Sequence, residues 1–102
     1  MSTDRIKNFM KRRDRITIYI SILESIMECS SKNATGYAKF THVMYRSNLS
    51  SQRLKERLQE LSYLDLITWD NLGIKLTHKG KNFLEEYKNL MIKIEKYIKI
   101  RD

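Results

Sequence analysis

The 102-residue sequence is poor in the residues from which disulfide frameworks, metal centres and phosphate-binding loops are built. Its single cysteine, Cys29, excludes an intramolecular disulfide framework and suits a reducing compartment. The two histidines, His42 and His78, have no companion cysteine, and three scattered glycines cannot form a glycine-rich phosphate loop. No serine has a visible histidine and acid partner set. We therefore expect no metal, no cofactor, no small-molecule substrate and no enzymatic activity.

Long hydrophobic runs are lacking as well. No apolar stretch approaches the ~18 residues that identify a transmembrane helix, and no secretory apolar segment follows the N-terminal charges. With 41% hydrophobic and 31% charged residues, the chain can bury a modest core and is expected to form one ordered domain. These features predict a cytoplasmic protein that does not span a membrane.

Positive charge is in excess, and it is concentrated at the two ends of the chain. Lys and Arg number 20 against 12 Asp and Glu, which gives a net charge of +8 and a pI near 9.7. Residues 1–15 carry +4, residues 16–74 carry zero and residues 75–102 carry +4. The excess favours a polyanionic partner, either nucleic acid or an anionic membrane surface. Because residues 16–74 carry no net charge, they limit which part of the chain can attract a polyanionic partner.

The first 13 residues are predicted to be a basic N-terminal arm, because they show little helical periodicity. Lys11, Arg12 and Arg13 are its main cationic cluster. Such an arm can lie along phosphates or in a minor groove. The alternative is a solvated terminus that aids solubility.

A first helix is predicted over residues 14–29, followed by a loop at residues 30–36. Helical spacing places six apolar residues on one broad face. They are Ile16, Tyr19, Ile20, Leu23, Ile26 and Met27. Ile18 and Ile22 lie off that face. They predict a second burial surface, either against a later helix or across a subunit interface.

Residues 40–66 carry the most informative pattern. A short helix over residues 39–46 is followed by a break at Ser47 and Asn48, and then by a third helix over residues 51–62. Ser50 or Ser51 can cap this third helix, and its leucines at positions 54, 58 and 61 predict a buried stripe. Two short helices joined this tightly are typical of a helix-turn-helix, whose second helix can enter a DNA major groove.

The exposed side of that third helix is the candidate DNA-reading surface. Gln52, Glu56 and Gln59 lie opposite the leucines, and Arg53 and Lys55 flank them. Gln can pair with adenine, Arg or Lys with guanine, and Glu can accept from cytosine. The residues predicted to contact phosphates are Ser50 and Ser51 at the helix start, the arm residues, and Lys75, Lys79 and Lys81.

A β-hairpin is predicted after the third helix. Residues 67–69 and 74–76 are β-prone, and residues 70–73 form a turn in which Gly73 can adopt a positive φ. Three helices followed by a small hairpin is the order of a winged helix-turn-helix domain, here assigned to residues 14–77. Because two-stranded ribbons are marginal alone, this wing must lean on the helices.

Residues 78–102 are predicted to be a long C-terminal helix, capped by Thr77 and with Gly80 allowing a close backbone approach. About 22 residues span roughly 33 Å, more than one small domain can bury. A heptad pattern therefore predicts dimerisation through its outer half. The dimerisation residues are Tyr87, Leu90, Met91, Ile94, Tyr97 and Ile98. The alternatives are a helix packed wholly within its own chain or one lying on a membrane.

Four segments together resemble small archaeal winged-helix DNA-binding proteins: residues 11–13 (KRR), 41–45 (THVMY), 47–50 (SNLS) and 76–80 (LTHKG). In that family the C-terminal helices pair as an antiparallel coiled coil. The resemblance implies a mainly α fold with a small β-hairpin, and a nucleoid-associated homodimer that binds double-stranded DNA as a transcription regulator or chromatin-type protein. The acid at Glu56 favours a regulator. The alternative is a winged-helix protein–protein module of a transcription or replication assembly.

Overall fold

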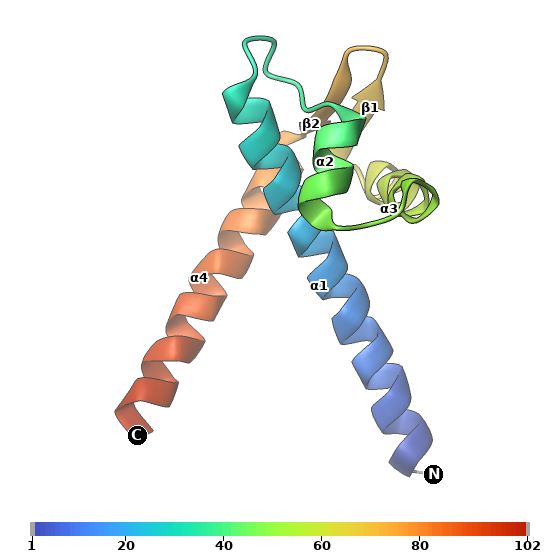
Figure 1. The fold of residues 1–102 in the computed structure, drawn as a ribbon. Coiled ribbons are helices and arrows are strands. Elements are labelled where there is room, and N and C mark those ends of the chain that lie inside the picture. The colour runs from blue at the N-terminus through green and yellow to red at the C-terminus, as the bar shows by residue number, and fades with distance from the viewer. Residues whose placement is uncertain (1, 102) are drawn as a thin grey trace.

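The fold was analysed in a computed structural model that describes the backbone of residues 2–101 and the side chains of residues 15–99. This part of the chain forms four helices and one antiparallel hairpin (Figure 1). The elements are α1 (Ser2–Lys32), α2 (Phe40–Ser47), α3 (Ser51–Tyr63), β1 (Ile67–Asp70), β2 (Gly73–Leu76) and α4 (His78–Arg101). The predicted fold class, mainly α with a small hairpin and a long C-terminal helix, is confirmed.

The helix α1 is longer than the sequence pattern predicts. It begins at Ser2 instead of Asp14, so the backbone of the basic N-terminal segment is helical. It also continues past Cys29 to Lys32, because no glycine or proline interrupts it. Ser30 and Ser31 therefore lie within the helix instead of in the predicted loop, and their hydroxyls donate to the carbonyls of Met27 and Glu28.

The core forms around the C-terminal half of α1. Ile20, Leu23 and Ile26 are buried as predicted, and Ile22 is fully buried as well. Since α1 contacts α2, β2 and α4, its second burial surface is covered by the same chain. Ile16 is an exception to the predicted face. It is 48% exposed, and Arg15 and Thr17 beside it are exposed as well, so the core does not reach this turn of α1.

The turn between α2 and α3 is built from local backbone and capping interactions. Asn48 ends α2 in the left-handed conformation with φ 58°, and its N–H donates to the Tyr45 carbonyl. Ser50 then caps α3, since its side-chain oxygen accepts from Arg53 N at 3.2 Å. This capping fixes where α3 begins, with three residues between it and the end of α2.

The hairpin leans on the helices, as predicted. Ala38, in the segment before α2, pairs with Ile74 of β2 through backbone hydrogen bonds of 2.7 and 2.9 Å. The ring of Trp69 on β1 stacks on Phe40 of α2, with centroids 5.9 Å apart and ring planes 14° from parallel. Phe40 therefore holds the wing against the helix-turn-helix unit.

The start of α4 is fastened to the end of α3. Thr77 caps it, since its Oγ1 accepts from Gly80 N at 2.9 Å and donates to the Asp65 carbonyl at 2.7 Å. A Cβ at Gly80 would lie 2.0 Å from the Leu66 carbonyl oxygen. Both predictions for this segment, the Thr77 cap and the close backbone approach at Gly80, are confirmed.

Only the first turns of α4 pack against the domain. Leu84 is buried and Phe83 and Tyr87 are partly buried, whereas every residue from 88 to 99 is exposed. The alternative in which this helix packs wholly within its own chain is therefore wrong. Figure 1 shows α1 and α4 diverging from the domain, with the outer half of α4 running clear of the rest of the fold.

Candidate nucleic-acid interface

The predicted base-facing residues lie together on the exposed side of α3. Gln52, Arg53, Lys55, Glu56 and Gln59 are all exposed, while Leu54, Leu58 and Leu61 on the other side are fully buried. The 13-residue helix is thus held in place by leucines, and its polar side chains extend into solvent. This is the geometry that an inserted recognition helix requires.

The N-terminus of α3 exposes the two predicted phosphate-contacting serines. Ser50 is the N-cap and Ser51 the first helical residue, and both are exposed. The Ser50 hydroxyl already accepts a hydrogen bond from Arg53 N, but its own proton remains free to be donated. An anion here would also meet the positive end of the helix dipole.

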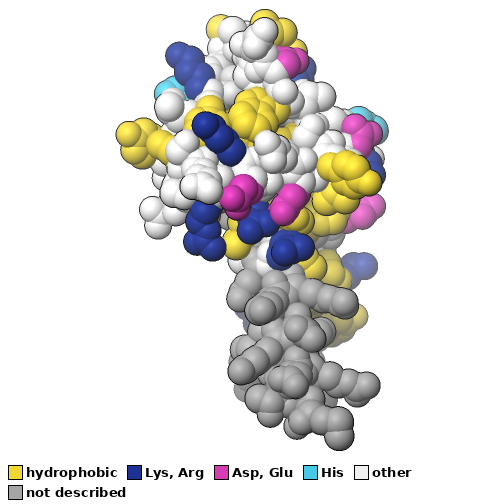
Figure 2. Space-filling view, turned by 90° about the vertical axis from the view of Figure 1, so that its right-hand side faces the viewer, with side chains coloured by type: hydrophobic (Ala, Val, Ile, Leu, Met, Phe, Trp, Pro, Cys, Tyr) yellow, Lys and Arg dark blue, Asp and Glu magenta, His cyan; other side chains and the backbone are white. Residues whose placement is uncertain are grey.

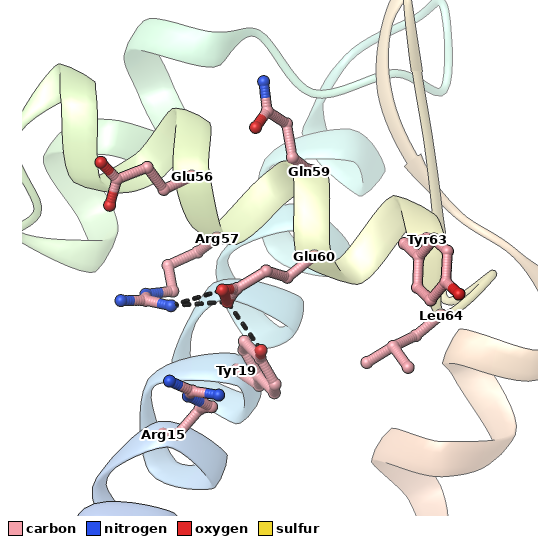
Figure 3. A pocket seen from close by; sticks show the side chains of 8 residues that line it. All are labelled: Arg15, Tyr19, Glu56, Arg57, Gln59, Glu60, Tyr63 and Leu64. Atoms are coloured by element: carbon pink, nitrogen blue, oxygen red, sulfur yellow. Dashed lines mark hydrogen bonds and ion pairs between the residues drawn. The ribbon is translucent and has the colours of Figure 1, made fainter.

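One cluster on α3 was not predicted. Arg57 Nη1 donates to both carboxylate oxygens of Glu60, at 2.5 and 2.7 Å, and the Tyr19 hydroxyl of α1 donates to Glu60 Oε1 at 2.7 Å (Figure 3). The spacing of Arg57 and Glu60 allows such a pair. Tyr19 is 41 residues away from Glu60, so no sequence pattern indicates its part in the cluster.

The cluster changes the ionisation of its members. Partial burial opposes the charged form of Glu60, but hydrogen bonds from Tyr19 and Arg57, with the charges of Arg57 and Arg15, hold its pKa below the usual value. Burial raises the pKa of Tyr19, and its hydrogen bond to the Glu60 carboxylate acts in the same direction. The charges of Arg57 and Glu60 therefore largely satisfy each other and contribute little to a partner.

An open hollow of about 670 Å³ lies between α1 and α3 beside this cluster. Arg15 and Tyr19 line it from α1, and Glu56, Gln59 and Tyr63 are among the residues that line it from α3. In Figure 3, Glu56 and Gln59 point away from the Tyr19–Glu60–Arg57 cluster. They are therefore free to contact a partner that covers α3.

Tyr63 is a second residue that sequence reasoning missed. It is the last residue of α3 and is 91% exposed. Because it follows Gln59 by four residues and Gln52 by eleven, helical spacing would have placed it with them. The predicted helix ended one residue too early for that inference.

The other predicted cations are placed unevenly. Lys75 on β2 lies over the Tyr37 ring, with Nζ 5.3 Å from its centroid, and it lines a second hollow together with Lys81. Lys79 instead donates to the Leu64 carbonyl at 3.0 Å. For Lys11, Arg12 and Arg13 only the helical backbone is described, and their side chains lie outside the described residues.

The α3 side of the molecule is not a continuous basic surface. Figure 2 views the side on which α3 lies, and Lys and Arg side chains there stand next to Asp and Glu side chains. Elsewhere, Glu28 of α1 pairs with Lys32 and with Arg46 of α2. The neutral charge of the middle segment is therefore visible as mixed charge on the surface.

His42 and His78 are exposed on different helices, α2 and α4. Within the described residues, no three His, Cys, Asp or Glu side chains gather as a metal site would require. The described helices include none that is long and apolar enough to cross a membrane.

A capped pair of short helices, a hairpin leaning on them and an exposed polar face on the second helix together define a winged helix-turn-helix domain. Comparison with known families agrees. The family described as winged helix-turn-helix matches residues 12–96, and the chain belongs to it. Domains of this family are in general those of DNA-binding regulators and are typically not enzymes. A comparison with curated proteins gave no match.

Proposed function

We propose that the protein is a nucleoid-associated homodimer that binds double-stranded DNA through α3 in the major groove, as a transcription regulator or chromatin-type protein. The observation that carries the proposal is the exposed polar face of α3, held outward by three fully buried leucines. A helix of about 10–12 Å diameter fits a major groove about 12 Å wide.

Phosphate contacts on both sides of α3 would hold it in the groove. Arg53 and Lys55, the two cations among the predicted base-facing residues, are exposed and can also reach phosphates. The Ser50 and Ser51 end offers a hydroxyl and backbone N–H groups. Lys75 and Lys81, which share a hollow near the wing, and Lys79 would add contacts further along the duplex. The basic residues 11–13 would supply the rest from the helical N-terminal segment.

The outer half of α4 would form the dimer. Its apolar side chains continue the row that begins with the buried Leu84 and the partly buried Tyr87. The exposed members of that row are Leu90, Met91, Ile94, Tyr97 and Ile98. An apolar stripe of this length is costly to leave in water and has the spacing of a coiled-coil seam. The resemblance implies antiparallel pairing of the α4 helices of two protomers. The resulting dimer would carry two α3 helices.

The proposal predicts tight, salt-sensitive binding to duplex DNA of random sequence. Each phosphate contact releases counterions, so about six contacts should give a slope of log K against log salt of roughly −5. Fluorescence anisotropy across a salt series measures this slope. No binding even at low salt would contradict the proposal.

Two variants that each lack four positive charges test where the DNA-binding surface lies. Substituting Arg12, Arg13, Arg53 and Lys55 with Ala should abolish binding while sedimentation still shows a dimer. The matched control removes four charges from the exposed outer half of α4, at Lys88, Lys93, Lys96 and Lys99, and should weaken binding much less. Equal losses in the two variants would mean that net charge alone attracts DNA.

A second candidate is a winged-helix module for protein assembly in a transcription or replication complex. The mixed charge around α3 and the exposed Tyr63 and Leu64 at its end favour it. Aromatic and aliphatic side chains of this kind are common in protein interfaces. This candidate replaces the first if the unaltered chain fails to bind DNA at low salt.

A further inference from the structure

The outward line of α3 contains no cation. Gln52, Glu56, Gln59 and Tyr63 recur at intervals of four, three and four residues, directly opposite the buried leucines. All four are exposed. They present two amides, a carboxylate and a phenol, whereas the cations Arg53 and Lys55 lie to either side. Hydrogen-bonding groups thus occupy the centre of this face and positive charges occupy its edges.

Glu56 is the acid on this line, and its side chain is exposed. Glu60, one helical turn later, is occupied by Arg57 and Tyr19. Within the described side chains, Glu56 takes part in no ion pair. Figure 3 shows its carboxylate pointing away from the Arg57 and Glu60 pair. A duplex covering α3 would therefore meet a carboxylate that is not held in an ion pair by any of the side chains described.

That charge is unfavourable for binding that ignores sequence. A carboxylate facing the groove is repelled by phosphates on both strands, so it weakens binding to most sequences. The repulsion is offset where the carboxylate accepts a hydrogen bond from the N4 amino group of cytosine. A residue with both properties discriminates between sequences while lowering affinity for the wrong ones.

We propose that α3 reads base sequence through the outward line and that Glu56 is a specificity-determining residue that selects cytosine. Gln52 and Gln59 select adenine beside it, through bidentate hydrogen bonds to N6 and N7. Arg53 and Lys55 were predicted to face bases, but they lie at the edges of this face, so here they are assigned to phosphates, which carry no sequence information. This inference rests on the proposed DNA binding, and it assigns the protein to sequence-specific regulators.

The position of α3 is held by the same cluster that removes Glu60 and Arg57 from the reading face. The Tyr19–Glu60 hydrogen bond joins α3 to α1 directly. A rotation of α3 would replace the outward line by its flanks, and this contact opposes such a rotation together with the buried Leu54, Leu58 and Leu61.

The test is a selection from a randomised duplex library with the full chain, followed by anisotropy on the enriched duplex and on a scrambled duplex of the same composition. The unaltered protein should enrich a motif that contains cytosine. Glu56→Gln should shift the preference at one position from cytosine to adenine, because Gln pairs with adenine. It should also bind the scrambled duplex more tightly and reduce the affinity ratio by about tenfold.

Glu85→Gln is the matched control, because it removes the same charge from an exposed site on α4. It should leave both the motif and the affinity ratio unchanged. Tight binding to random duplexes without any enriched motif would overturn this inference and leave the proposed DNA binding intact. The inference would also be overturned if the Glu56→Gln variant enriched the same motif as the unaltered protein. No binding to any duplex would overturn the proposed function itself.

Discussion

Gly80 shows how one missing side chain allows a close contact between two segments. It lies against the Leu66 backbone at the point where α4 joins the rest of the domain. Helix propensity alone would favour alanine here by about 1 kcal/mol. The backbone carbonyl opposite cannot move without displacing the residue that begins β1, so the tertiary contact outweighs propensity.

Gly80→Ala is therefore expected to destabilise the protein by about 2 kcal/mol or more, since the added Cβ would overlap the Leu66 carbonyl oxygen. The thermal midpoint should fall by roughly 8 °C or more, which differential scanning calorimetry measures. Asn82→Ala, at an exposed position in the same part of α4, should change stability by less than about 0.5 kcal/mol. If the two variants melt together, α4 does not approach Leu66 this closely.

Glu60 makes stability depend on pH in the acid range. The pKa of Glu60 is lower in the folded protein than in the unfolded chain. Its contribution to the free energy of unfolding is therefore fully present above the unfolded pKa, about 4.3, and is lost as the pH falls through the folded pKa. Glu60→Gln should thus cost about 1 kcal/mol at pH 7, an amount reduced by the partial exposure of the pair. The difference from the unaltered protein should shrink as the pH falls through the lowered folded pKa of Glu60.

Urea unfolding of both proteins across this pH range tests the assignment. Glu56→Gln is the control in the same helix, since Glu56 has no ion-pair partner among the described side chains, and its effect on stability should not follow the same pH profile. A Glu60→Gln effect that is constant from pH 7 to pH 3 would show that the carboxylate charge does not contribute.

At the scale of the elements, α4 combines two functions along one continuous apolar row. Its first turns complete the domain core through Leu84, and its outer half carries the same row into solvent. A helix that is apolar on one side beyond its domain needs a second surface to cover it. For this reason the proposed dimerisation is through the row from Tyr87 to Ile98 and not through the hairpin or α2.

Replacing Leu90 and Ile94 with Gln should convert the proposed dimer into a monomer of 12.3 kDa, because it removes two apolar residues from the centre of the row. Sedimentation equilibrium measures the mass. Ile92→Gln is the matched control, since Ile92 is 51% exposed, similar to Leu90 at 55%, but lies off the row. A monomeric mass for the unaltered chain would exclude dimerisation through α4.

At the scale of the whole molecule, charge and shape are arranged differently from what a nonspecific DNA coat requires. Net positive charge resides in residues 1–15 and 75–102, and much of these two segments forms the diverging parts of α1 and α4. The domain between them, which carries α3, is neutral overall and of mixed charge on its α3 side. In the proposed complex, residues 11–13 with Lys75, Lys79 and Lys81 would add attraction from outside α3, and discrimination would come from the outward line of α3.

Much of the fold could be predicted from the sequence because it depends on local chemistry. The leucine spacing of α3, the Ser50 and Thr77 caps, the turn before Gly73 and the breakers around Asn48 each act within a few residues. The start of α1 was predicted wrongly because that prediction also relied on a local pattern. Weak amphipathic periodicity in residues 2–13 was interpreted as absence of a helix, although no glycine or proline interrupts them.

The sequence by itself determined the order of the elements, the buried stripe of α3 and the length of the apolar row on α4, since helical and strand periodicity are properties of neighbouring residues. Only the tertiary structure decided that Tyr19 holds Glu60, that Phe40 supports Trp69 and that Ile22 is buried while Ile16 is not. These outcomes depend on which distant segment covers each face. The spacing of residues within one segment does not indicate which distant segment will cover it. That is decided by how the segments pack.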